Sequence, residues 1–181
     1  MSKTDAITLL KDDHRHVKHL FEQFEASGDR RAKAILVKEA LLELKIHTTV
    51  EEELFYPVVR KAMKKALGKE EATDVMDEAD EEHHVAKLLI AELETMKPSD
   101  DHWEAKFTVL SENILHHVKE EEGEMFPKAR GLDVDFDALG EKILARKEEL
   151  KASGVPEFAE QTLIGKFGIA DSPARAAALA H

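Results

Sequence analysis

Two stretches of sequence, 70 residues apart, decide the fold: residues 47–57 read HTTVEEELFYP and residues 117–127 read HVKEEEGEMFP. Each contains a histidine, a glutamate four residues later, and then an aromatic residue followed by proline. A second repeated block precedes each of them, because residues 12–25 read DDHRHVKHLFEQFE and residues 81–94 read EEHHVAKLLIAELE. A period of 69–70 residues that occurs only twice predicts two similar helix pairs in a pseudo-symmetric bundle rather than a solenoid.

Apolar residues recur at helical spacing along most of the chain, and glycine or proline falls between the periodic stretches. The pattern predicts helices over about residues 4–26, 29–67, 70–96, 99–130 and 136–152. Pro57 should bend or end the second helix, because proline cannot donate a backbone hydrogen bond. We expect an all-α fold, an up-down-up-down four-helix bundle with an additional C-terminal helix and tail. Residues 1–130 should form the bundle, and residues 131–181 should pack on it through a set of apolar tail residues: Phe158, Leu163, Ile164, Phe167 and Ile169.

The composition of the chain argues against several classes of function. The 181 residues carry a formal net charge of −12, which disfavours nucleic acid as a partner because phosphates would be repelled. The chain contains no cysteine, so disulfide scaffolds, thiolate metal clusters and cysteine nucleophiles are excluded. Apolar runs are too short to span a membrane, and the charged N-terminal stretch has no signal-peptide core. We therefore expect a cytoplasmic protein with no membrane partner, while the sequence leaves the oligomeric state open.

The repeated histidines lie on the apolar faces of the predicted helices, at positions where leucine or isoleucine is expected. The faces of the first two helices comprise Ile7, Leu10, His14, Val17, Phe21 and Phe24, then Val37, Ala40, Leu44, His47, Glu51, Leu54 and Val58. Those of the next two comprise Met76, Ala79, His83, Ala86, Ile90 and Leu93, then Phe107, Leu110, Ile114, His117 and Glu121. Counting residues from the connecting turns puts paired histidines within roughly 6 Å along the bundle axis. Five further histidines should face solvent or lie on a helix flank: His16, His19, His84, His102 and His116.

Four imidazoles and two carboxylates in one layer of an apolar core need compensation, because burying an unpaired charge is very costly. No lysine or arginine occupies these faces, so a bound cation is the simplest remedy. Six such ligands are more than the four that one tetrahedral zinc ion binds. They suit two octahedral metal ions that share carboxylates. Iron is the expected metal, and manganese or zinc are possible substitutes.

These residues resemble the hemerythrin-like family, also called HHE cation-binding domains, over about residues 1–130. The resemblance implies a four-helix bundle that holds two iron ions in an oxo- or hydroxo-bridged di-iron centre. His14, His47, His83 and His117 would be terminal ligands, and Glu51 and Glu121 would be bridges. Oxygen-carrying members have a fifth histidine where this chain has Ala79, and their last carboxylate comes one position later, at Glu122 here. A water, a further carboxylate or Tyr56 could take the place of the missing histidine.

The resemblance implies binding of dioxygen, nitric oxide or peroxide, for sensing, scavenging or iron-dependent redox chemistry. An apolar wall of Leu10, Phe21, Leu44, Leu54 and Ile114 would exclude water. The alternatives are a di-iron catalase- or oxidase-like enzyme, an iron storage or handling protein, and a helical interaction domain without metal. A ferritin-like site needs Glu-x-x-His on two helices, and only the segment from Glu81 to His84 fits, off the apolar face.

Overall fold

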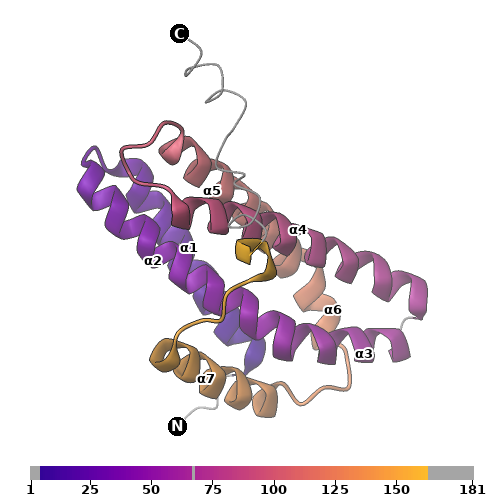
Figure 1. The fold of residues 1–181 in the computed structure, drawn as a ribbon. Coiled ribbons are helices and arrows are strands. Elements are labelled where there is room, and N and C mark those ends of the chain that lie inside the picture. The colour runs from indigo at the N-terminus through magenta and orange to yellow at the C-terminus, as the bar shows by residue number, and fades with distance from the viewer. Residues whose placement is uncertain (1–4, 67, 163–181) are drawn as a thin grey trace.

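The computed structural model describes residues 5–66 and 68–162, although the side chains of residues 69–74 lie outside the description (Figure 1). The described chain is entirely helical, which confirms the all-α prediction. Its elements are α1 (Ala6–Ala26), α2 (Arg30–Val50), η1 (Glu51–Phe55), α3 (Tyr56–Ala66), α4 (Lys69–Thr95), α5 (Trp103–Glu120), η2 (Glu121–Met125), α6 (Phe126–Arg130) and α7 (Phe136–Ser153). None of the helices in this part of the chain has the length and apolarity that crossing a bilayer demands.

Two π-helical turns interrupt the second and fourth predicted helices. In η1 the backbone N–H of Tyr56 donates to the carbonyl of Glu51, and in η2 that of Phe126 donates to Glu121. A π turn contains one residue more than a turn of α-helix. The residues that follow it are therefore rotated about the helix axis. For this reason the sequence prediction for Val58 was wrong: Val58 is 37% exposed, and Val59 occupies the buried position instead.

The bundle core consists of two apolar clusters that lie on either side of a polar layer. One contains Val17, Phe21, Phe24, Leu44, Ile90, Phe107 and Ile114 among others. The other contains Leu10, Ile46, Val50, Phe55, Met76, Phe126 and Ile143 among others. His14, His47, His83 and His117 separate the clusters along their helices and are themselves buried. The five histidines that were predicted to lie off the apolar faces are exposed, as the periodicity predicted: His16, His19, His84, His102 and His116.

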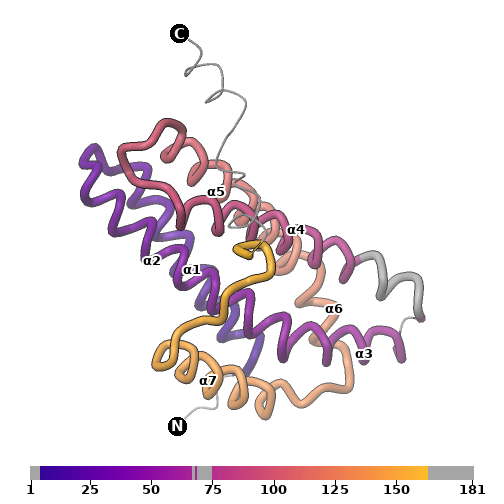
Figure 2. The backbone as a smooth tube through the Cα atoms, in the orientation of Figure 1, coloured from indigo at the N-terminus to yellow at the C-terminus, as the bar shows by residue number. Residues whose placement is uncertain are grey.

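Helix α7 covers one side of the bundle, where it contacts α1, α2 and η1. Arg146 of α7 donates to both carboxylate oxygens of Glu53 at 2.7 and 3.0 Å. After α7 the chain runs back along the bundle toward α4 (Figure 2), where Glu160 accepts a hydrogen bond from His84 at 2.9 Å. The Phe158 ring lies near the ammonium groups of two lysines on α2 and α4. The predicted contacts of Leu163, Ile164, Phe167 and Ile169 lie outside the described residues, and the division at residue 130 stays a prediction.

Candidate metal centre

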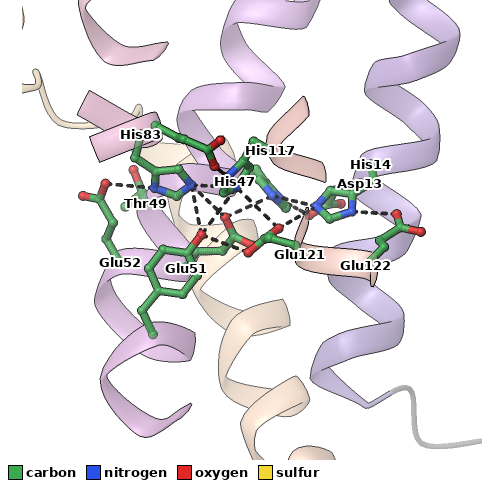
Figure 3. A network of polar contacts seen from close by, with 12 residues as sticks. Asp13, His14, His47, Thr49, Glu51, Glu52, His83, His117, Glu121 and Glu122 are labelled. Carbon is green, nitrogen blue, oxygen red and sulfur yellow. Dashed lines mark hydrogen bonds and ion pairs between the residues drawn. The ribbon is translucent and has the colours of Figure 1, made fainter. Parts of the chain in front are cut away.

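Two pairs of imidazoles meet in the polar layer (Figure 3). The Nε2 atoms of His14 on α1 and His47 on α2 lie 3.2 Å apart, and so do those of His83 on α4 and His117 on α5. Two nitrogens bound at about 2.1 Å to one cation, at an angle of 90–100°, would be separated by about 3.0–3.2 Å. Each pair is therefore spaced as two ligands of a single metal would be.

The carboxylates of Glu51 and Glu121 lie between the pairs. Glu51 Oε2 is 3.1 Å from His47 Nε2 and 3.3 Å from His83 Nε2, so this carboxylate faces one histidine of each pair. Glu121 Oε2 does the same for the other two histidines, at 3.3 Å from His14 and 3.5 Å from His117. Each glutamate is the first residue of a π turn and lies four residues after a histidine, which places both on one face of the helix.

Four further carboxylates hold the outer nitrogens of the histidines, and sequence reasoning missed them. The Nδ1–H groups donate across helices in four bonds: His47 to Asp13 at 3.2 Å, His83 to Glu52 at 3.1 Å, His117 to Glu82 at 2.7 Å and His14 to Glu122 at 2.9 Å. With the Nδ1 proton held in this way, each imidazole that loses its second proton has a free Nε2 lone pair that points into the centre.

The repeated sequence blocks contain a pattern that could have identified these four carboxylates. In both halves an acid directly precedes the first histidine and another directly follows the buried glutamate. Residues 51–53 and 120–122 are runs of glutamate, a pattern that is usually solvated apart from the one member on the buried face of the helix. Glu51 and Glu121 are those inward members, but Glu52 and Glu122 also take part by binding an imidazole.

Tyr56 breaks the symmetry of the centre. Its hydroxyl donates to Glu121 Oε1 at 2.9 Å and lies 3.1 Å from Nε2 of His83, while Phe126 occupies the equivalent position in the second half of the chain. The Phe126 ring stacks on His14 with 5.8 Å between centroids. Burial raises the pKa of Tyr56 well above its ordinary value, and the carboxylates of Glu121 and Glu51 raise it further. One imidazole pair therefore has an oxygen donor beside it, and the other has a hydrocarbon ring.

The buried carboxylates of the centre need positive charge beside them, which protonated imidazoles or a bound cation can supply. Although burial alone lowers the pKa of His47, the carboxylates of Glu51 and Asp13 raise it to about 10. Burial likewise lowers the pKa of His83, but Glu51 and Glu52 raise it to about 9. For Glu51 burial raises the pKa, and the facing imidazoles hold it well below its ordinary value. Positive charge next to these carboxylates is strongly favoured.

The unpaired oxygens fit a metal as well. Both carboxylate oxygens of Glu51 and Oε2 of Glu121 are fully buried and accept no hydrogen bond from the described residues. Burying such atoms without a partner is costly, and a metal ion supplies the missing interaction. In the polar layer, ligand atoms within 4.8 Å of one another form two groups: His14, His47, Glu51 and Glu121, and Glu51, His83 and His117. The donor set therefore fits two cations that share a carboxylate.

A small apolar cavity borders the imidazoles. Its volume is about 10 Å³, and its walls include Val17, Leu44, Ile114 and Val118 beside the four histidines. Two of the residues expected in the apolar wall, Leu44 and Ile114, line it. The space suffices for roughly one water-sized molecule.

Comparison with known proteins agrees with this geometry. Residues 5–129 match the family described as the hemerythrin HHE cation binding domain. The chain belongs to this family. The HHE chain is 29% identical to the uncharacterized protein Rv2633c of Mycobacterium tuberculosis over 154 residues, which cover 82% of this chain and 89% of that protein.

The HHE fold is also found among solved structures. The crystal structure of a hemerythrin HHE cation binding domain-containing protein from Mycobacterium kansasii, a homologue of Rv2633c, matches with a TM-score of 0.67 and 26% identity, covering 82% of this chain and 88% of that one. A DNA nickase of Nostoc sp. is 25% identical over 122 residues, or 67% of this chain but only 32% of that protein. The cation-binding family and its bundle fold are thereby established for this chain.

Proposed function

We propose that this HHE protein holds two iron ions and binds dioxygen, nitric oxide or peroxide beside them. The ligands in this proposal are His14, His47, Glu51, His83, His117 and Glu121. The supporting observation is that each buried glutamate faces one histidine from each imidazole pair. Two separate single-metal sites would not need this cross-connection, whereas two adjacent cations do. When bound, iron would supply the redox change and the open coordination positions that small ligands require.

The protein groups around the centre have three roles in this proposal. Glu51 and Glu121 keep the two cation positions adjacent, and the four outer carboxylates orient the imidazoles and increase their basicity. The apolar cavity of about 10 Å³ beside the imidazoles favours ligands of a few atoms on this side of the centre. We propose Tyr56 as a further oxygen ligand on the His83 and His117 side, where oxygen carriers of the family use a histidine.

A second candidate function is a catalase- or oxidase-like turnover of peroxide or oxygen. The observation that favours it is the inequivalence of the two cation positions, because Tyr56 lies next to one and Phe126 next to the other. The residue at the fifth-histidine position of oxygen carriers is the buried Ala79, which cannot be a ligand. Both features favour redox turnover over reversible oxygen carriage.

Metal analysis of the purified protein, combined with an optical spectrum, tests the proposal. We expect about two iron ions per chain after anaerobic loading with Fe(II) and oxidation in air, with absorption from charge transfer to iron(III). A folded protein that retains no stoichiometric metal would refute the proposal and support a purely structural interaction domain. Hydrogen peroxide turnover by the loaded protein then separates the enzyme from the binding protein. A stable and reversible dioxygen adduct would contradict the preference for redox turnover.

A further inference from the structure

A cavity on the α4 and α5 side of the bundle leads from the surface toward the centre. Its volume is about 150 Å³, and it lies beside Ala79, whose small side chain leaves the space open. His117 and the buried Glu121 line its inner end, while Glu78, Glu120 and Glu124 line the part nearer the solvent. The lining residues include no lysine or arginine, and Lys128 pairs with one of them, Glu124, at 2.9 Å. The walls are therefore strongly acidic.

A group of possible metal ligands stands at this cavity. Nε2 of His116 lies 3.1 Å from a carboxylate oxygen of Glu120 and 3.6 Å from Oε1 of Glu82. The three side chains offer ligand atoms that all lie within 4.8 Å of one another. His116 and Glu120 form the same four-residue pair as His117 and Glu121, displaced by one residue around the helix. One pair therefore faces outward and the other inward.

Glu82 connects the outer group with the inner one. Its Oε2 accepts the Nδ1–H of His117 at 2.7 Å, while Oε1 faces His116. At the inner end, Oε2 of Glu121 is fully buried and accepts no hydrogen bond from the described residues. A cation would stabilise this buried oxygen. Carboxylates thus lie along the cavity from its outer part to its inner end, at Glu120, Glu82 and Glu121.

The first half of the chain provides an internal comparison, because the repeat assigns an equivalent to every residue of this region. Subtracting 69 or 70 from Glu78, Ala79, His116, Glu120 and Glu124 gives Leu9, Leu10, Ile46, Val50 and Leu54. Leu10, Ile46 and Val50 belong to a buried core cluster that also contains Leu139, Ile143 and Leu150 of α7. Leu9 and Leu54 are partly buried and pack against this cluster. The two halves of the chain therefore differ at equivalent positions. In the first half these positions are apolar and α7 packs against them, whereas in the second half they are acidic and line an open cavity. The net negative charge of the whole protein does not explain why carboxylates replace leucines on one side only.

We propose that this cavity is the route by which divalent cations, Fe(II) in particular, reach the centre, with His116, Glu120 and Glu82 as their first binding group. The proposal rests on the internal two-cation site proposed above. Acidic walls attract a dication and raise its local concentration, so the route should mainly affect the rate of uptake. It should not affect how many cations the centre finally holds.

Stopped-flow uptake of Fe(II) by the metal-free full-length protein, under anaerobic conditions and at low ionic strength, tests this route. We expect the double variant Glu120→Gln/Glu124→Gln to take up iron about tenfold more slowly than wild type, with an unchanged final stoichiometry. Added salt should slow wild type more than this variant. The matched control is the double variant Glu148→Gln/Glu157→Gln, which makes the same two charge changes at exposed positions outside the cavity. It should keep the wild-type rate.

A second variant tests whether the open volume of the cavity, rather than its negative charge, matters for uptake. Ala79→Leu places in α4 the residue that Leu10 supplies in α1, and it should fill the cavity and also slow uptake. Circular dichroism and thermal melting of the metal-free protein verify the fold of both variants. If wild type binds two cations and both variants load at the wild-type rate, this route is wrong while the proposed function stands. If wild type binds no stoichiometric metal, the proposed function fails and the route fails with it.

Discussion

Replacing Glu51 with glutamine tests the central geometric argument, because this carboxylate faces both imidazole pairs. Glutamine keeps the size of the side chain but removes its charge. Both cation positions should suffer from this single change, whereas a ligand of one position would affect that position only. We expect the metal content to fall from two ions per chain to at most one.

The size of the effect follows from known metal sites. Removing a group that merely orients a ligand costs about 10- to 100-fold in metal affinity, so losing a shared carboxylate should cost at least about 100-fold, or about 2.8 kcal/mol. At a free metal concentration of about 100 times the wild-type Kd, binding at one site stabilises the folded wild type by about 2.7 kcal/mol. With a hundredfold weaker site, the same concentration stabilises the variant by only about 0.4 kcal/mol.

The assay compares thermal melting with and without Fe(II) under anaerobic conditions, together with metal analysis after dialysis. Wild type should gain about 5–10 °C in Tm per occupied site, and Glu51→Gln about 1–2 °C. Glu53→Gln is the control, because Glu53 carries the same charge in the same run but is exposed and bound by Arg146. Its effect on stability should stay within about 1 kcal/mol, with two ions bound. Retention of two ions at wild-type affinity by Glu51→Gln would refute the bridging role.

Three further predictions concern Tyr56, the first helix and the core. Tyr56→Phe should still bind two cations but lose any phenolate-to-iron(III) absorption band, and a band of unchanged intensity would contradict the ligand role. Asp5 caps α1 and pairs with Arg130 at 2.8 Å; burial raises its pKa, but its hydrogen bonds and Arg130 lower it more. Asp5→Ala should cost about 1 kcal/mol in urea unfolding at neutral pH. Because the pKa of Asp5 is depressed in the folded state, wild type should have a higher free energy of unfolding than Asp5→Asn above about pH 4, and this difference should disappear as the pH falls further. Equal differences at pH 7 and pH 3 would contradict this. Phe107→Ala should cost about 3–5 kcal/mol without changing the metal content, whereas the exposed Val109→Ala should change unfolding little; loss of metal from the Phe107 variant would show that the two regions are coupled.

The sequence by itself determined the bundle and the inner residues of the centre. Helical periodicity is a local property, so the apolar faces could be read directly, and polar residues on them were conspicuous. His14, His47, His83 and His117 were predicted to meet because antiparallel helices of similar length bring equivalent heights together. The structure brings them together with Glu51 and Glu121. Their role as metal ligands stays a prediction.

Only the tertiary structure decided the features that depend on contacts between helices. The outer carboxylates bind histidines of other helices, and the π turns rotate Val59 rather than Val58 into the core. The sequence predicted a C-terminal helix packed on the bundle, but it did not show which half α7 covers or that the other half has an open acidic cavity. The physical reason is that local periodicity reports which face of a helix is buried, but not which side chain across the interface faces each polar group. That pairing depends on helix rotation, and one extra residue in a turn is enough to change it.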